Sequence, residues 1–220
     1  MKTHYYLGWF NDVFFEKLVN LLHEDITDRK SLVMISANPF LYEDEEVGAT
    51  ERSWLDQAKI IFDEYHLINY SIQKEEAQKL IKNASVIFLL GGNTVEQNGL
   101  LIEYELTDLI KKSRAVVMGA SAGAINMSNK WLCSKHTGYK VETSTIYYGI
   151  GLDEFSVLSH YDIENNITQI QSELSPLSQE MNIYASNKDC VVRVKGDKID
   201  ILGNVYLISH SKIHKLEETL

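Results

Sequence analysis

Prolines and cysteines are scarce in this chain of 220 residues, which has two of each. So few prolines, and the lack of any Gly/Ser-rich stretch or run of one charge, argue against a linker, a low-complexity tail or an array of repeats. Hydrophobic residues make up 45% of the chain, which is enough to bury a full core. We therefore expect a single domain over residues 1–220.

Basic residues are also fewer than acidic ones. The chain has 21 Lys and Arg and 31 Asp and Glu, which gives a net charge of −10. This balance argues against binding to the phosphate backbone of a nucleic acid. No apolar run approaches the about 18 residues of a membrane span, and the opening MKTHYYLGWF lacks the apolar segment of a signal peptide. We expect a cytoplasmic protein that binds neither nucleic acid nor membrane.

Motifs for metals, disulfides and nucleotides are missing as well. Cys133 and Cys190 have no CxxC spacing and no flanking histidine pattern, so we interpret them as reduced thiols in the core. There is no GxGxxG or GxxxxGK[ST] motif, and neither glycine-rich loop carries a lysine for phosphates. We therefore expect no bound metal and no nucleotide cofactor.

The apolar residues that are present alternate between two periods. Continuous runs at Ser31–Ala37, Ser85–Gly92 and Ala115–Ala120 end in small or turn residues, as strands buried on both faces do. Stripes with helical spacing lie around them, at Val13, Phe14, Leu18, Leu21 and Leu22 after the candidate caps Asn11 and Asp12, at Trp54, Leu55, Ala58, Ile61, Phe62 and Tyr65, at Ala77, Leu80 and Ile81, and from Leu101 to Ile110. This alternation predicts an α/β fold with a parallel sheet.

The pattern changes after Tyr147. The stretch CVVRVKGDKIDILG, Cys190 to Gly203, has two apolar segments separated by Gly196 and Asp197. Such a glycine-containing break between two strand-like segments predicts a C-terminal β-hairpin.

Ser121 lies at the centre of the small-residue stretch AVVMGASAGAINMS, residues 115–128. A serine between a strand and a helix often only caps the first helical turn. Capping does not require the small neighbours found here, which are Gly119, Ala120, Ala122, Gly123 and Ala124. They fit the GxSxG nucleophile elbow, a sharp turn that exposes the serine Oγ and aims the next amide at a developing oxyanion. The stretch therefore predicts Ser121 as a nucleophile.

A serine nucleophile needs a base, and the chain has seven histidines. His160 ends the apolar run EFSVLSHYD, so it lies at an expected strand end beside the other loops. His136, in the loop-like CSKHTGY, remains a rival. The other five, at the starts of apolar runs, at the end of a helix or in a polar tail, are His4, His23, His66, His210 and His214. We expect His160 to be the general base.

Two glycine-rich segments end neighbouring strands, LLGGNT at residues 89–94 and MGASAG at residues 118–123. The carboxyl ends of parallel strands meet at one edge of a sheet, where ligands bind. The N–H groups of Gly92 and Ala122 are therefore candidates for an oxyanion hole. The alternative is that Gly91, Gly92 and Asn93 form only a turn.

Three motifs in this order resemble those of the dipeptidase E and cyanophycinase family of serine peptidases: LLGGNT, then MGASAGA at residues 118–124, then YGIGL and VLSHYD within residues 148–162. The resemblance implies a three-layer α/β fold with a mostly parallel central sheet, similar to class I glutamine amidotransferases but with serine in place of cysteine. It implies Ser121 as nucleophile, His160 as base, and Gly92 and Ala122 as oxyanion donors. It also implies hydrolysis of short peptides with an N-terminal aspartate, or of aspartyl-linked isopeptide polymers, without a metal or organic cofactor.

The family's third triad member is a carboxylate just before the last hairpin. Alignment there places Asn187 or Lys188 opposite it, so we expect Asp189 to serve as the acid, with Asn187 as the alternative occupant. The chain also departs from the family at Leu158-Ser159, before the histidine, and at Val95-Glu96-Gln97, after the glycine-rich loop. These departures leave the substrate specificity and the acid open.

The expected reaction is acyl transfer from a small peptide to Ser121, with His160 as base. An esterase-type α/β hydrolase is an alternative, and its chain order would need an acid before His160, either Asp153 or Glu154. A second alternative is a catalytically weak relative that binds a peptide or small metabolite. A glutaminase-type partner of a synthetase is disfavoured because the elbow has no cysteine. We expect a monomer or homodimer.

Overall fold

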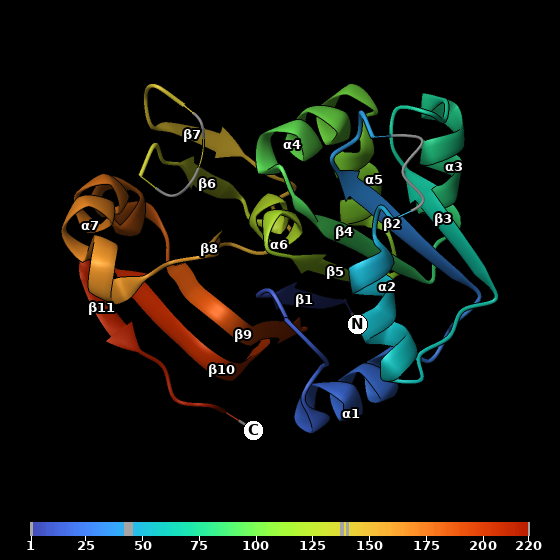
Figure 1. Ribbon diagram of the computed structural model, residues 1–220, viewed down its shortest axis with the longest axis horizontal. Helices are drawn as coiled ribbons and strands as arrows, with labels where there is room; N and C mark the ends of the chain where they lie inside the picture. The colour runs from blue at the N-terminus through green and yellow to red at the C-terminus, as the bar shows by residue number, and fades with distance from the viewer. Residues whose placement is uncertain (1, 42–45, 137–138, 140, 220) are drawn as a thin grey trace.

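The computed structural model describes residues 2–41, 46–136, 139 and 141–219 (Figure 1). Its strands are β1 (Thr3–Leu7), β2 (Ser31–Ala37), β3 (Glu64–Ile68), β4 (Val86–Gly92), β5 (Val116–Ala120), β6 (Lys130–Cys133), β7 (Thr145–Tyr148), β8 (Ser156–Leu158), β9 (Ile183–Lys195), β10 (Lys198–Ser209) and β11 (Lys212–Lys215). Its helices are α1 (Glu16–Asp25), α2 (Ala49–Gln57), α3 (Lys74–Asn83), α4 (Thr94–Glu103), α5 (Leu106–Lys112), α6 (Ala122–Met127) and α7 (Ile163–Glu180).

The main sheet has nine strands in the order β11-β10-β9-β1-β5-β4-β2-β3, with β8 also paired to β9. The strands from β1 to β3 along this order are parallel to one another, whereas β9, β10 and β11 are antiparallel to their neighbours in this order, and β8 pairs with β9 in parallel. A separate two-stranded sheet pairs β6 with β7. The predicted α/β class, with a mostly parallel central sheet and a C-terminal hairpin, is confirmed.

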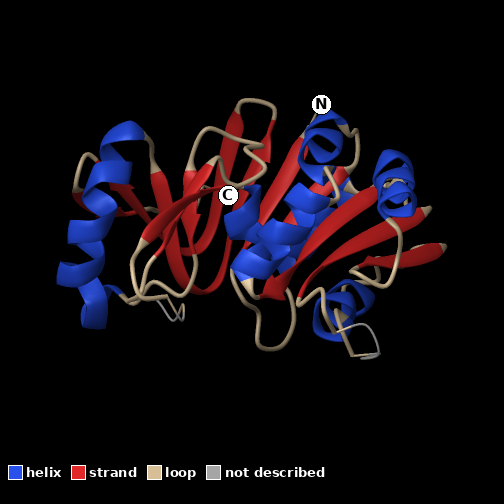
Figure 2. Ribbon diagram, turned by 90° about the horizontal axis from the view of Figure 1, so that it is seen from above, coloured by secondary structure: helices blue, strands red, loops and turns tan. Residues whose placement is uncertain are grey.

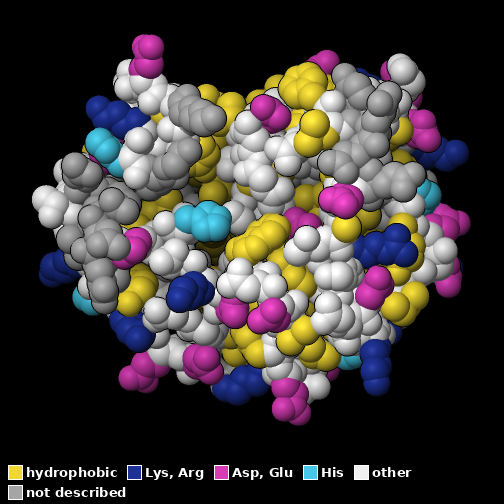
Figure 3. Space-filling view, in the orientation of Figure 1, with side chains coloured by type: hydrophobic (Ala, Val, Ile, Leu, Met, Phe, Trp, Pro, Cys, Tyr) yellow, Lys and Arg dark blue, Asp and Glu magenta, His cyan; other side chains and the backbone are white. Residues whose placement is uncertain are grey.

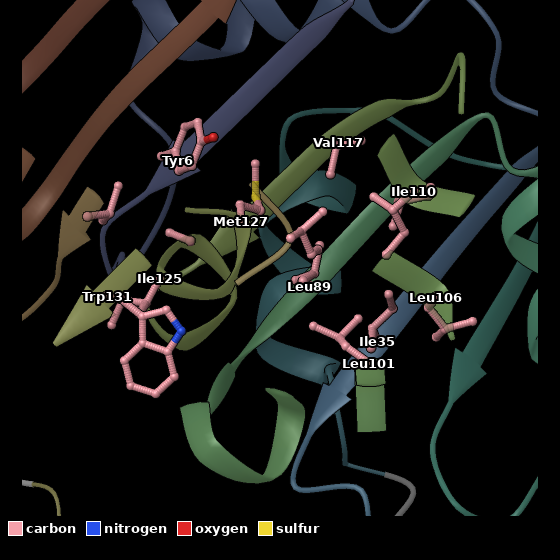
Figure 4. Packing of buried hydrophobic residues seen from close by; sticks show 14 of the residues in the cluster. Tyr6, Ile35, Leu89, Leu101, Leu106, Ile110, Val117, Ile125, Met127 and Trp131 are labelled. Carbon is pink, nitrogen blue, oxygen red and sulfur yellow. The ribbon is translucent and has the colours of Figure 1, made fainter. Parts of the chain in front are cut away.

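Helices lie on both faces of the sheet (Figure 2). Successive side chains of a strand point to opposite faces, so β2 divides its residues between two cores. Val33 and Ile35 pack with α3, α4, α5 and α6, and Leu32 and Met34 pack with α1 and α2. In the first core, side chains from β1, β4 and β5 converge with those of α4, α5 and α6 (Figure 4). The result is a three-layer sandwich.

The predicted strands are confirmed almost to the residue, because β2 has the expected bounds and β4 and β5 each begin one residue later than expected. The C-terminal hairpin also forms, and its turn is at Gly196 and Asp197. A third core lies beneath this hairpin, where α7 contributes Leu174 and Leu177.

Three helix predictions were wrong in extent. The first helix begins at Glu16 after Phe15, so neither Asn11 nor Asp12 caps it, and Val13 is 52% exposed. Phe14 is nevertheless buried, together with Phe10, by aromatic packing in the segment that precedes the helix.

The second helix ends at Gln57, before the end of its predicted stripe. Lys59 has a left-handed backbone with φ of 59°, which stops the helix, and the chain then turns into β3, where Tyr65 lies. The run from Leu101 to Ile110 likewise divides into α4 and α5, because Glu105 has φ of 54°. Periodicity alone did not reveal these breaks, since neither residue is a glycine or a proline.

Both cysteines are buried and free. Burial raises the pKa of the Cys190 thiol to about 11, so little of it ionises near neutral pH. In the described part of the chain, no helix is long and apolar enough to cross a membrane.

Candidate active site

The chain makes a strained turn at Ser121, between the end of β5 and the start of α6. The residue has φ of 47° and ψ of −103°, values that an L-residue rarely adopts. Its N–H donates to the carbonyl of Leu7 at 3.0 Å, and its carbonyl accepts from Ile125 N–H at 3.0 Å. These bonds fix the turn to β1 on one side and to α6 on the other.

Two glycines allow this turn to pack against its neighbours. A Cβ at Gly123 would lie 2.0 Å from the carbonyl oxygen of Leu89, and one at Gly119 would lie 2.5 Å from the carbonyl carbon of Gly123. Both distances are far below any van der Waals contact, so a larger residue at Gly123 would push α6 away from β4, and one at Gly119 would push it away from β5. The small residues around Ser121 thus serve close backbone approach, in addition to the unusual conformation of the serine.

His160 follows β8, which pairs in parallel with β9, and its backbone is also left-handed, with φ of 58°. The next residue, Tyr161, donates its N–H to the carbonyl of Ser186 at 2.9 Å, which fixes the loop to β9. The His160 Nε2 and the Ser121 Oγ are 2.8 Å apart, a hydrogen-bond distance. The two strained residues therefore meet, although 39 positions separate them.

The imidazole of His160 is placed to act as a base. Partial burial lowers its pKa, because it disfavours the charged form of the ring. The ring is therefore neutral near pH 7 and has a free lone pair for the serine proton. Its other nitrogen, Nδ1, makes no hydrogen bond with any residue that the structure describes.

Asp189 and Asn187 lie in a stretch of β9 that leaves the sheet. Cys190 pairs with Gly203 and Ser186 with Val205, so three residues of β9 oppose a single residue of β10. These three, Asn187 to Asp189, are exposed, and within the described ranges neither Asp189 nor Asn187 has a hydrogen bond to His160. The structure therefore does not bring the expected acid to the imidazole.

The rival residues lie elsewhere. His136 faces Glu173 of α7, with its Nε2 3.8 Å from Oε1 of that carboxylate. Asp153, an acid that an esterase order would require, accepts hydrogen bonds from Tyr6 Oη at 2.7 Å and pairs with His4 Nδ1 at 2.8 Å. Tyr6 and His4 both belong to β1. Glu154, the other acid that an esterase order would allow, is exposed.

The candidate oxyanion donors are the residues that begin α6 and end β4. Ala122 is the first residue of α6, so its N–H has no acceptor within the helix. Gly92 has φ of 136°, and a Cβ there would lie 2.8 Å from Nδ2 of Asn38. This φ lies in the region that favours glycine.

Two side chains that contact the end of β4, just before Gly92, were not predicted from the sequence. Glu51 accepts a hydrogen bond from Gly91 N–H, and Gln97 donates to the carbonyls of Leu90 and Ile35. No motif contains Glu51, and Gln97 stands out in the sequence only as a departure from the family pattern. The face seen in Figure 3 is hollowed near its middle, with hydrophobic side chains and a histidine at the edge of the hollow.

The fold and the strained serine at the strand end define a class, that of three-layer α/β proteins with a serine in the turn between a parallel strand and the helix that follows it. The family follows from sequence: the model of "Peptidase family S51" matches residues 13–202, and the chain belongs to this peptidase family. It is 23% identical over 138 residues to a cyanophycinase from Geminocystis herdmanii (strain PCC 6308). That match covers 60% of this chain and 51% of the relative, so the chain spans about half the length of that protein.

Solved structures agree on the fold. A peptidase from an acI-B1 Actinobacterium superposes with a TM-score of 0.69 at 16% identity, covering 100% of this chain and 96% of that one. A putative peptidase E protein from Listeria monocytogenes EGD-e gives 0.63 at 17% identity, covering 92% of this chain and 98% of that one.

The direction of the His160 pKa predicts a pH profile. A histidine ordinarily titrates near pH 6.5. Because burial lowers the pKa of His160, the neutral base persists below that pH, and the rate of Ser121 acylation should fall only as the pH drops through the lowered value. The measurement is the rate of fluorophosphonate labelling between pH 4.5 and 8. His136→Ala should leave the profile unchanged and His160→Ala should abolish labelling; a His160→Ala protein that is labelled at the wild-type rate would contradict the assignment of His160 as the base.

Proposed function

We propose that this protein is a serine peptidase that hydrolyses small peptides, of the aspartyl dipeptide or isopeptide type, through an acyl-enzyme. The observation that carries the proposal is the 2.8 Å distance between Ser121 Oγ and His160 Nε2, in a member of peptidase family S51. A strained serine in contact with a neutral imidazole is the arrangement that activates a hydroxyl nucleophile.

In the proposed reaction, Ser121 Oγ attacks the scissile carbonyl carbon while its proton passes to His160 Nε2. The N–H groups of Ala122 and Gly92 stabilise the tetrahedral oxyanion. His160 then gives its proton to the leaving amine, and the C–N bond breaks to leave an ester on Ser121. Water then attacks this ester carbon while one of its protons passes to His160, the bond from that carbon to Ser121 Oγ breaks to release the acid, and His160 returns the proton to Ser121 Oγ. Apart from the peptide and one water molecule, the proposed steps use only groups of the chain.

A second function, slow turnover or binding of a peptide or small metabolite, is favoured by the second ring nitrogen of His160, because no carboxylate among the described residues contacts it. In a serine-protease triad, a buried carboxylate on the second ring nitrogen fixes the tautomer, and replacing it with an amide costs about 10⁴ in kcat. His160 Nδ1 has no such partner among the residues described. The pair Ser121–His160 is therefore proposed to act as a dyad.

A screen of dipeptides that includes Asp-X and β-aspartyl isopeptides tests the proposal, run beside a fluorophosphonate probe. We expect labelling at Ser121 and release of the first residue from at least one peptide of these two types. Labelling without hydrolysis of any peptide would favour the slow or binding relative. No labelling of the wild-type protein would overturn the peptidase assignment.

A further inference from the structure

The strand that ends at Gly92 contains a bulge. Ile35 pairs with Leu89 and Ala37 pairs with Gly92, so β4 has one residue more than β2 over this stretch. A bulge disrupts the ladder, leaves backbone groups unpaired and redirects the residues that follow. Here the residue that follows is Gly92, the proposed oxyanion donor.

One unpaired group, the Gly91 N–H, is satisfied by a buried carboxylate. It donates to Glu51 Oε1 at 2.9 Å, and Glu51, in the first turn of α2, is only 4% exposed. A Cβ at Gly91 would lie 2.5 Å from the ring of Trp9, so the indole covers this side of the bulge. Burial raises the pKa of Glu51, and no ion pair of Glu51 with a described residue offsets that burial.

Two carbonyls at the bulge are satisfied by a single amide. Gln97 Nε2 donates to Leu90 O at 3.1 Å and to Ile35 O at 3.0 Å, which joins β4 to β2 where their ladder is interrupted. Its Oε1 accepts from Asn126 Nδ2 at 3.0 Å, and Asn126 lies in α6, the helix that begins after Ser121. Gln97 and Asn126 are both fully buried.

We propose that Glu51 and Gln97 are positioning residues that hold the β4 bulge from two sides and thereby fix the Gly92 N–H relative to Ser121. This proposal rests on the proposed function. Neither side chain touches the reacting atoms; each acts through the backbone of residues 90–92. The hydrogen bond that Asn126 donates to Gln97 connects the bulge to the helix that begins after Ser121.

The energetic reason is the cost of unpaired groups. A buried carbonyl or N–H without a partner costs about 1–3 kcal/mol, so without these side chains the bulge would relax toward other partners. Loss of an oxyanion donor costs about 10²–10³ in rate, and a displacement of about 1 Å near reacting atoms can cost about 10². Loss of either side chain should therefore slow acylation by about 10- to 100-fold.

The test measures fluorophosphonate labelling of the full-length protein, separated into the maximal rate (kinact) and the half-saturating concentration (KI). Gln97→Met keeps the length of the side chain but removes both donors, and we expect kinact to fall about 10- to 100-fold with KI within about twofold. The kinact of Glu51→Leu should fall by a similar factor. The kinact of Glu51→Gln, which keeps an acceptor for Gly91 N–H, should stay close to that of the wild type. Gln78→Met, which removes a comparable bond to Tyr104 O away from the bulge, is the matched control and should label like wild type.

Two further readouts, unfolding and the pH midpoint of labelling, separate a positioning effect from general damage to the fold. Each variant should unfold cooperatively, and if Gln97→Met does not fold, the pair Glu51→Leu and Glu51→Gln decides. The pH midpoint of labelling should stay that of the wild type, because the Ser121–His160 contact is intact. Folded Gln97→Met and Glu51→Leu that label at the wild-type rate would overturn the proposal while leaving the peptidase assignment standing. A wild-type protein that is not labelled at all would instead overturn the proposed peptidase function.

Discussion

Ser121→Ala should abolish fluorophosphonate labelling and lower the hydrolysis of any peptide substrate by at least about 10⁴-fold, since removal of a catalytic serine costs about 10⁶ in a comparable enzyme. The cause is direct, because alanine removes the Oγ that lies 2.8 Å from His160 Nε2. Alanine also fits the small-residue turn, so the unfolding temperature should stay close to that of the wild type.

The control is Ser128→Ala, another buried serine near the same helix, whose hydroxyl accepts from Val157 N–H at 3.0 Å. It removes a structural hydrogen bond, and it should cost about 1–3 kcal/mol of stability because Val157 N–H is left without a partner, while labelling persists in the folded protein. A Ser121→Ala protein that hydrolysed peptide at the wild-type rate would show that another residue is the nucleophile.

Arg193→Met should destabilise the protein by about 3–5 kcal/mol, because the substitution leaves buried carboxylates without their main partner. Arg193 binds Asp25 through two hydrogen bonds of 2.8 and 3.0 Å and Asp200 through one of 2.5 Å. The side chains of both aspartates are fully buried. Lys195 also contacts Asp25, and Lys198 contacts Asp200, but the two lysine side chains are 33% and 64% exposed. This cluster joins α1 to β9 and β10, so thermal and denaturant unfolding should both report its loss.

The pH dependence of this difference provides a further check. Burial alone would raise the pKa of Asp25, but hydrogen bonds from Arg193 and Lys195 outweigh it and lower the pKa. The stability from this pairing is therefore present above the ordinary aspartate range, near pH 4, and is lost as the pH falls through the lowered value. The difference in the free energy of unfolding between wild type and Arg193→Met should therefore become smaller in that acidic range. Lys17→Met, which breaks an exposed ion pair with Glu218, should cost at most about 1 kcal/mol.

Local patterns in the sequence were sufficient for the framework of the fold and for the tight turn at Ser121. Runs such as Ser31–Ala37 predicted strands because a strand buried on both faces must be apolar along its whole length. Gly119 and Gly123 predicted the tight turn around Ser121 because a Cβ at either position collides with neighbouring backbone. Such constraints act within a few residues, so they are visible in the sequence.

Contacts between distant segments were decided by the tertiary structure. Which histidine meets Ser121 depends on the pairing of β8 with β9, and the exposure of Asp189 depends on the bulge that takes it out of the sheet. Glu51 and Gln97 reach the same bulge from helices on either side of it, a juxtaposition that has no local signature. The sequence by itself determined where the strained serine lies and which strand precedes it; only the folded chain decided what surrounds it, because side chains such as those of Ser121 and His160, 39 positions apart, meet by packing rather than by periodicity.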